Sequence, residues 1–205
     1  MSEEKREAQD APMAENAQLV ANDAAGQTAV APASTTATAP ARKATSAPAQ
    51  KAAARKLPPI QKVYEAWTAL ADGRIKAEGG FTDASGQAHV SSSDGSKAYT
   101  VKWDGDTYAS TDNATYWQGY AGYPVIAVLM LQGRLPCDER IARLFAGVPW
   151  KQVNDACKRD YAKALAQVLD ERRIVDEERE LIDDAAQKII CQLDALNLKL
   201  KRKLS

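Results

Sequence analysis

The strongest constraint on how this chain folds is a change of composition at Leu57. Residues 1–57 contain 19 alanines and no aromatic residue, so every tryptophan, tyrosine and phenylalanine lies beyond this point. A segment without large apolar side chains buries too little surface to offset the entropy lost on folding. We therefore expect residues 1–57 to be a disordered tail, rich in alanine, proline, threonine and lysine, that precedes the folded part.

The second half of this tail is basic. Between positions 24 and 56 it carries no acidic residue, and its basic residues are Arg42, Lys43, Lys51, Arg55 and Lys56. Such a segment can bind nucleic acid by contacting phosphates. Five charges spread over so long a segment make few phosphate contacts, so a solubilising linker is the simpler interpretation.

Charge and hydropathy bound the class of protein. Twenty-seven basic residues balance 27 acidic ones, so net charge gives no reason to expect nucleic acid. The amino terminus is charged rather than apolar, and no apolar run reaches the roughly 18 residues of a membrane helix. The three cysteines, an odd number at uneven spacing, do not indicate a disulfide framework. We expect a cytoplasmic protein that does not enter the membrane.

Residues 58–136 have the pattern of a small α+β module. Apolar residues at helical spacing predict a helix over 60–71. Two short runs, 98–103 and 107–110, flank Asp104-Gly105, a strong hairpin signal, and 89–92 is a third candidate strand. Residues 117–131 are apolar nearly all round, which predicts a buried helix whose regular part begins at Pro124.

Residues 137–205 are predicted to be helical throughout. The expected helices cover 137–145, 150–172 and 175–203. The last has apolar residues at heptad spacing, namely Ile182, Ala186, Ile189, Leu193, Leu196 and Leu200. This face suits either an internal helical hairpin, which we favour because the preceding joint is short, or a coiled coil between two copies of the chain.

Three stretches in order resemble the SWIM zinc-binding module: Val90 to Trp103, Tyr108 to Asp112 and Gly122 to Leu129. The resemblance covers about residues 88–133 and implies a ββα unit. In that family a Cys-x-Cys pair on the hairpin and a Cys-x-His pair at the start of the helix converge on one zinc ion. SWIM modules mediate contacts with DNA or protein, which the resemblance implies for this chain too.

The zinc ligands of the family are absent here. Aligning the motif places its four ligand positions on Tyr108, Ser110, Gly122 and Pro124, none of which binds zinc in that way. Zinc is the family's ion, but we expect no metal and no other cofactor in this chain. A structural zinc contributes on the order of 10 kcal/mol to a small domain, so something must replace it. We expect Tyr108 and an aromatic loop, made of Tyr116, Trp117, Tyr120 and Tyr123, to fill the space of the ion.

Catalysis has little support in the sequence. His89, the single histidine, has no acid or nucleophile placed to work with it, and the cysteines lack the flanking patterns of catalytic thiols. We expect a non-enzymatic binding protein that contacts a protein partner through the aromatic loop or the heptad face. The alternative is a nucleic-acid-binding accessory protein that uses the basic tail and the carboxyl-terminal cluster Lys199, Lys201, Arg202 and Lys203.

Overall fold

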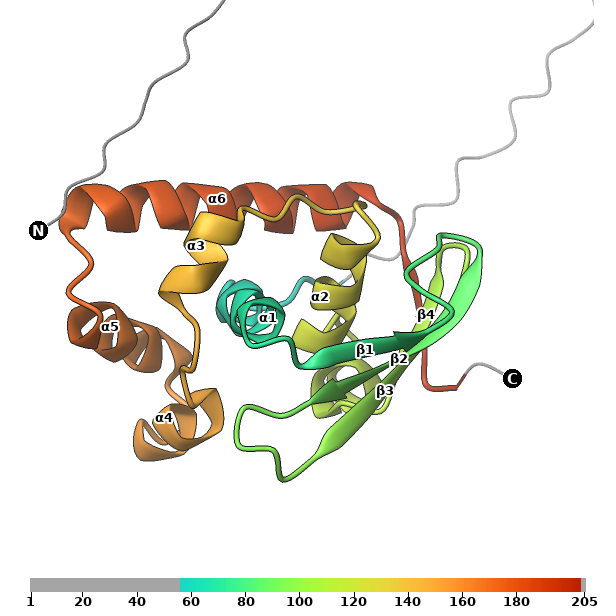
Figure 1. Ribbon diagram of the computed structural model, residues 1–205, viewed down its shortest axis with the longest axis horizontal. Coiled ribbons are helices and arrows are strands. Elements are labelled where there is room, and N and C mark those ends of the chain that lie inside the picture. Colours follow the sequence, from blue (N-terminus) through green and yellow to red (C-terminus); the bar gives the residue numbers. More distant parts are fainter. Residues whose placement is uncertain (1–55, 204–205) are drawn as a thin grey trace, which may run out of the picture. The chain divides into compact units, whose positions relative to one another are not determined.

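The computed structural model describes residues 56–203 (Figure 1). The expected disordered tail lies outside the described residues, and so do four of its basic positions, Arg42, Lys43, Lys51 and Arg55. The described part has an α+β fold, as the sequence predicts.

Five strands form one sheet in the order β1-β2-β3-β4-β5. The strands are β1 (Ile75–Glu78), β2 (Ser85–Ser91), β3 (Ala98–Asp104), β4 (Thr107–Ser110) and β5 (Lys199–Lys201). The first four are antiparallel neighbours, whereas β5 runs parallel to β4. The predicted hairpin is confirmed, with Asp104 opposite Thr107 and a positive φ of 52° at Gly105.

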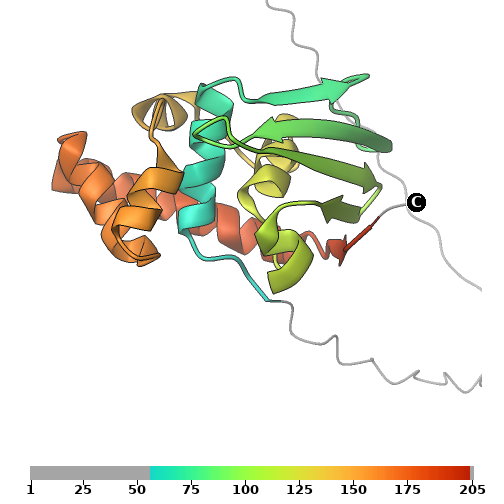
Figure 2. The same cartoon turned by 90° about the horizontal axis from the view of Figure 1, so that it is seen from below.

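The helices lie on one side of this sheet (Figures 1 and 2). They are α1 (Gln61–Ala71), the short π-helix η1 (Ala114–Gln118), α2 (Tyr123–Leu131), α3 (Glu139–Leu144), α4 (Trp150–Ala156), α5 (Tyr161–Glu171) and α6 (Asp176–Ala195). Burial alternates along β2 and β3, so one sheet face packs on the helices and the other faces solvent.

Helix α2 is the centre of the core. Residues 125–129 are fully buried because the helix is apolar on every side, and it packs against α1 and the sheet. Its start next to Pro124 agrees with the sequence-based prediction. Its end is made by Gly133 at φ 72°, where Arg134 N–H donates to the Leu129 carbonyl.

The predicted helix 150–172 is wrong in one respect, because the chain forms two helices there. Lys158 and Arg159 have φ values of 54° and 66°, which a continuing right-handed helix does not allow. Asp160 then caps α5, accepting a hydrogen bond from the Lys163 amide at 3.1 Å. Lys158 and Arg159 therefore form the turn between α4 and α5.

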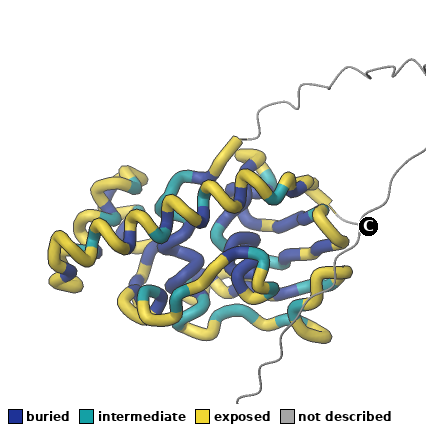
Figure 3. Tube along the Cα trace, turned by 90° about the horizontal axis from the view of Figure 1, so that it is seen from above, coloured by how far each residue is buried: buried dark blue, intermediate teal, exposed yellow. Residues whose placement is uncertain are grey.

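The predicted helix 175–203 also ends early. Asn197 adopts a left-handed φ of 49°, which terminates α6, and the chain continues as β5 beside β4. The first four heptad positions, Ile182 to Leu193, are 3% exposed or less and belong to the core that includes α1 (Figure 3). The heptad face is thus covered within the chain, which contradicts the coiled coil, and α6 packs on α1 rather than along α5 as a simple hairpin would.

Residues 58–136 and 137–205, expected as separate domains, share one hydrophobic core and one sheet. The aromatic centre of that core shows why: Phe145 of the second segment stacks on Trp67 of the first at 6.1 Å and meets Tyr64 edge-on at 5.1 Å. The boundary expected at 136/137 therefore does not divide two folding units.

Candidate functional site

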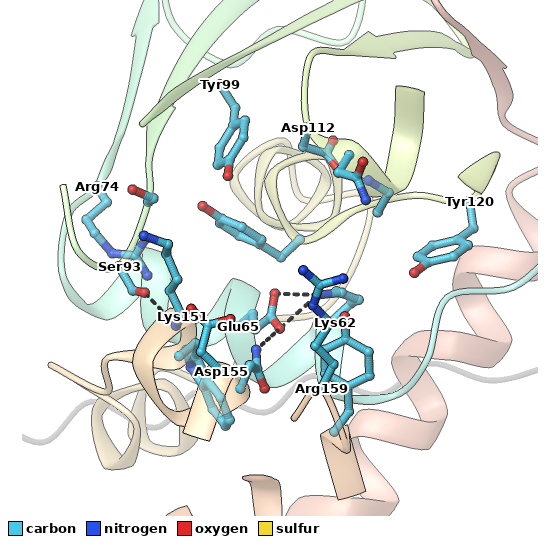
Figure 4. Close-up of a pocket in the computed structure, with 17 residues that line it drawn as sticks. Lys62, Glu65, Arg74, Ser93, Tyr99, Asp112, Tyr120, Lys151, Asp155 and Arg159 are labelled. Carbon is cyan, nitrogen blue, oxygen red and sulfur yellow. Dashed lines mark hydrogen bonds and ion pairs between the residues drawn. The ribbon is translucent and has the colours of Figure 1, made fainter. Parts of the chain in front are cut away.

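A polar pocket of about 230 Å³ lies between the sheet and the helices. Its wall comes from α1, the β2–β3 turn, β3, the start of η1, the start of α2, α4 and the α4–α5 turn. Figure 4 shows side chains converging on it from all sides, with Tyr99, Asp112 and Tyr120 opposite Lys151, Asp155 and Arg159. We call this site the polar pocket.

A buried ion pair forms one wall of the polar pocket. The Lys62 ammonium lies 2.8 Å from both carboxylate oxygens of Glu65, which also accepts from Asn154 Nδ2 at 3.3 Å. Burial alone would lower the pKa of Lys62, but the Glu65 carboxylate outweighs it and raises that pKa above its ordinary value of 10.5. The Lys62 ammonium therefore stays charged at neutral pH.

Two further cations of the pocket are each held by an acid outside it. Arg74 Nε lies 3.1 Å from Asp72 Oδ2, and Lys151 Nζ lies 2.7 Å from Asp94 Oδ2. Hydrogen bonds from Lys151, Ser92 and Ser96 hold the pKa of Asp94 well below its ordinary range. The positive charges of Arg74 and Lys151 are therefore already balanced.

Four tyrosines line the pocket: Tyr99, Tyr120, Tyr123 and Tyr161. Tyr99 and Tyr123 meet edge to face at 6.1 Å, and the Lys56 ammonium lies 5.1 Å from the centre of the Tyr120 ring. Burial raises the pKa of the Tyr99, Tyr120 and Tyr123 hydroxyls, so these remain neutral phenols at physiological pH. In Figure 4 the hydroxyls of Tyr99 and Tyr120 point towards the cavity.

Asp112 is the unusual member of this wall. Its Oδ1 accepts hydrogen bonds from the amides of Ala114 and Thr115 at 2.9 and 3.0 Å, which fixes the start of η1. Its Oδ2 has no hydrogen-bond partner among the described residues. Water does not satisfy it readily either, because the residue is only 5% exposed. A β-carbon at Gly122 would lie 2.1 Å from Oδ1, so only glycine fits beside this carboxylate.

The four positions expected to be degenerate zinc ligands are only partly brought together. Ser110 Oγ accepts from the Asp112 amide at 3.3 Å and Gly122 abuts the Asp112 carboxylate, so these two positions meet through Asp112. Tyr108 is directed elsewhere, donating to Gln132 Oε1 at 2.6 Å, and Pro124 is buried in the first turn of α2. Within residues 56–203, no group of three or more His, Cys, Asp or Glu side chains is placed to hold a metal ion.

The expected aromatic filling of a zinc space is wrong. Tyr116 and Trp117 form the sole ring contact among the five aromatic residues in the described chain, and Trp117 is 65% exposed. Tyr120 and Tyr123 line the polar pocket instead, and Tyr108 belongs to the sheet core. The Asp112 carboxylate, not a ring cluster, occupies the region between Ser110 and Gly122.

The carboxyl-terminal basic cluster lies beside the ring pair of half-buried Tyr116 and exposed Trp117. The Arg202 guanidinium is 5.9 Å from the centre of the Tyr116 ring and 5.5 Å from that of Trp117. Lys199 and Lys201 are exposed on β5, the edge strand next to η1. We define the aromatic–basic surface as Tyr116, Trp117, Lys199, Lys201, Arg202 and Lys203.

Sequence reasoning missed most charged groups of the polar pocket. The Lys62 and Glu65 pair has the spacing of neighbours on one helix face, which is a usable signal. The cap formed by Asp160 signals the turn that places Arg159, but nothing local shows that this turn faces η1. Tyr120, Tyr123 and Asp112 were in the stretch that the sequence had singled out.

Fold and site together define a mixed α+β protein with one polar pocket between its sheet and its helices, in the part of the chain that the structure describes. The chain matches the family described as Uncharacterised conserved protein UCP014422 over residues 55–199, and it belongs to that family. No curated protein and no solved structure shows significant similarity to it. The match runs through both segments that share the core. The family description names no zinc module, so the SWIM resemblance stays a prediction.

Proposed function

We propose that this protein is a non-enzymatic binding protein that holds a small polar ligand in the polar pocket. The observation that carries the proposal is the buried Asp112 oxygen without a partner, on the wall of the pocket where charged and tyrosine side chains converge. A pocket with a few convergent polar groups is the usual form of a ligand site. A buried polar atom left unpaired costs about 1 to 3 kcal/mol, and more when it is charged, which a ligand donor would relieve.

Binding is favoured over chemistry because neither the histidine, the commonest general base, nor any of the cysteines lines the pocket. All three cysteines are free thiols, which supports a reducing, cytoplasmic location as part of this proposal. Among residues 56–203, no helix is both long and apolar enough to cross a membrane.

The test is a thermal-shift screen of the full chain against small polar compounds, compared with a blocked pocket. Asn113 is exposed at the pocket mouth, so Asn113→Trp should fill the entrance; Gln118→Trp, at the other end of η1, is the matched control. A ligand at 100 times its Kd stabilises the native state by about 2.7 kcal/mol, which raises Tm by several degrees. We expect hits on the wild type and on Gln118→Trp that vanish in Asn113→Trp. Hits that survive the blocked entrance would refute the pocket as the site.

A second candidate function rests on the aromatic–basic surface. We propose that it binds single-stranded nucleic acid, because exposed rings stack on bases while lysine and arginine neutralise phosphates. The supporting observation is that Arg202 lies over Trp117, which joins the aromatic loop and the basic cluster in one surface. This extends the nucleic-acid alternative indicated by the sequence.

Fluorescence anisotropy with a labelled single strand tests this second function. Trp117→Ala should weaken binding by about 5- to 150-fold, since one stacked base contributes about 1 to 3 kcal/mol. Affinity should fall steeply with added salt. Lys188→Gln, an exposed charge change on α6, is the control. If neither Trp117→Ala nor added salt changes the affinity, the aromatic–basic surface is not the binding site. A protein partner, as expected from the sequence, would then be the better candidate.

A further inference from the structure

The charged groups of the polar pocket divide into those already paired and those left for a ligand. Lys62, Arg74 and Lys151 each have an acidic partner within 3.1 Å. Arg159, which is exposed on the α4–α5 turn, makes no side-chain hydrogen bond or ion pair within the described residues. On the opposite wall, Asp112 Oδ2 has no partner. Within the described residues, one cation, Arg159, and one anion, Asp155, therefore remain without an ion pair on one side of the cavity, and Asp112 remains without one on the other (Figure 4).

The Asp112 carboxylate cannot turn to satisfy its free oxygen. Oδ1 is held by two backbone amides, and Gly122 packs directly against the carboxylate. No side chain or amide in the described part of the chain supplies the missing hydrogen bond, so the oxygen is open to a donor from outside the chain. The oxygen is deeply set, so a compact donor with a full positive charge suits it better than a wide planar one.

The surroundings of Asp112 also favour a cation. Asp112 and Asp94 act with burial to raise the pKa of Tyr99, which places the Asp112 charge near that phenol. Tyrosine faces attract ammonium groups, and a carboxylate beside several rings is a recurring cation site. The pocket thus combines an acid with tyrosine rings and their neutral hydroxyls.

We infer that the polar pocket binds a small zwitterion, with its ammonium group at Asp112 among the tyrosines and its carboxylate or phosphate group on Arg159. The inference rests on the proposed ligand-binding function and names the ligand class for it. The volume of about 230 Å³ is below that of drug-sized sites, about 300 to 1,000 Å³, and suits a molecule of amino-acid size. An arginine fork is well matched to the planar oxygen pair of a carboxylate.

The experiment uses probes that separate the two charges. Glycine, β-alanine, 4-aminobutyrate and 6-aminohexanoate carry both charges at increasing separation; hexylamine and hexanoate carry one each. Calorimetry on the full chain at up to about 10 mM probe detects millimolar binding. We expect at least one zwitterion to bind at least tenfold more tightly than hexylamine, and hexanoate to bind more weakly still.

Two isosteric variants assign the charges. Asp112→Asn keeps an oxygen for the two amides of η1 but replaces the free oxygen with a donor, so affinity for the zwitterion should fall at least 30-fold while the protein stays folded. Arg159→Gln should cost about tenfold and remove the advantage of the zwitterion over hexylamine. Asp138→Asn, another helix cap, and Lys158→Gln, the neighbouring charge, should leave affinity unchanged.

The outcomes distinguish this inference from the proposed function beneath it. If hexanoate binds as tightly as any zwitterion and Asp112→Asn has no effect, the inference is overturned while a ligand pocket for anions survives. If no probe binds, and the broader screen finds nothing that depends on the open entrance, both fail. Should Asp112→Asn not fold, Arg159→Gln decides alone, because its side chain is exposed and makes no contact on which folding depends.

Discussion

Helix α1 lies between two environments, an apolar core on one side and the polar pocket on the other, and they differ in how their buried polar groups are paired. On its apolar side, Tyr64, Trp67 and Phe145 pack ring against ring. On its polar side, Lys62 and Glu65 face the pocket as a buried ion pair. Both sides belong to one short helix of 11 residues, so a single element joins the core to the candidate site.

Each environment contains one buried side-chain atom without a partner in the described chain, and the two have different consequences. Trp67 Nε1 is a neutral N–H whose cost, about 1 to 3 kcal/mol, is exceeded by the roughly 5 kcal/mol gained from burying the ring. Asp112 Oδ2 belongs to a charged group with no large apolar surface to compensate. Ring burial thus offsets the cost of the unpaired Trp67 Nε1 in the core. The cost of the unpaired Asp112 Oδ2 is not offset in this way, which supports the proposal that a ligand pairs with it.

The largest expected effect lies on the apolar side. Phe145→Ala should lower the free energy of unfolding by about 3 to 5 kcal/mol, because it removes a fully buried ring that contacts two others. Urea denaturation measures it, with Leu144→Ala, the neighbouring residue at 38% exposure, as control. Equal losses for the two variants would show that the ring cluster is not the centre of the core.

A smaller effect is expected for the buried ion pair. Glu65→Gln should destabilise the protein by about 2 to 3 kcal/mol, because the Lys62 charge loses its counter-ion while a hydrogen-bond acceptor is kept. Adding Lys62→Met should recover part of the loss, since an apolar chain then fills the site of the stranded charge. If Glu65→Gln unfolds at the same urea concentration as the wild type, the Lys62–Glu65 pair is exposed to water in solution and does not stabilise the fold.

Alkaline pH should weaken both sides of α1. Burial raises the pKa of Tyr64 on the apolar side and of Tyr99 and Tyr123 in the pocket above the ordinary 10.0. A group whose pKa is raised by folding contributes fully below its unfolded pKa, and the contribution is lost as pH rises through the folded pKa. The free energy of unfolding should therefore be level to about pH 9.5 and fall above it.

The tyrosine origin of that fall can be isolated. Tyr123→Phe removes one titrating hydroxyl and its 3.3 Å hydrogen bond to the Ser91 carbonyl, so the loss above pH 10 should be shallower than in the wild type. Urea midpoints between about pH 7 and 11 measure both slopes. An identical alkaline slope in the variant would exclude Tyr123 as a source of the pH dependence.

Patterns local to the sequence predicted the core far better than the pocket. Helix 60–71, the hairpin at Asp104-Gly105 and the buried helix at Pro124 all follow from periodicity and turn chemistry within short windows. The errors came where a few left-handed residues redirected the chain: Arg159 before α5 and Asn197 before β5. Arg159 carries no sequence signal of a helix end, whereas Asn197 does, but the heptad spacing on either side of it favoured a continuous helix.

The candidate site could not be assembled from sequence because its groups are distant in the chain. Lys62 lies on α1, Asp112 between β4 and η1, and Arg159 between α4 and α5, and these parts meet only through the tertiary fold. The resemblance to a zinc module did direct attention to Asp112 and its neighbours. It could not show that the carboxylate itself, with one oxygen capping η1 and one left over, would be the chemically distinctive feature.

The smallest expected effect concerns the Lys151–Asp94 ion pair at the rim of the pocket, which contrasts with the buried Lys62–Glu65 pair. Lys151 is 49% exposed, so its pair with Asp94 is screened by water and salt. Lys151→Gln should therefore shift the urea midpoint less than Glu65→Gln does, and the shift should vanish near 1 M NaCl, where the screening length is about 3 Å. Arg143→Gln, which breaks an exposed pair with Glu139 away from the pocket, is the matched control.

The same rim pair predicts an acid-side difference. The pKa of Asp94 is depressed below its ordinary 3.8, so its contribution is present above that value and is lost as pH falls towards the folded pKa. Removing Lys151 takes away the first of the interactions that depress it, and the loss of stability below about pH 4 should become shallower. A Lys151→Gln variant that keeps the full acid dependence would assign it to Ser92 and Ser96. If Lys151→Gln at high salt lowers the urea midpoint as much as Glu65→Gln does, the Lys151–Asp94 pair is as shielded from water as the Lys62–Glu65 pair.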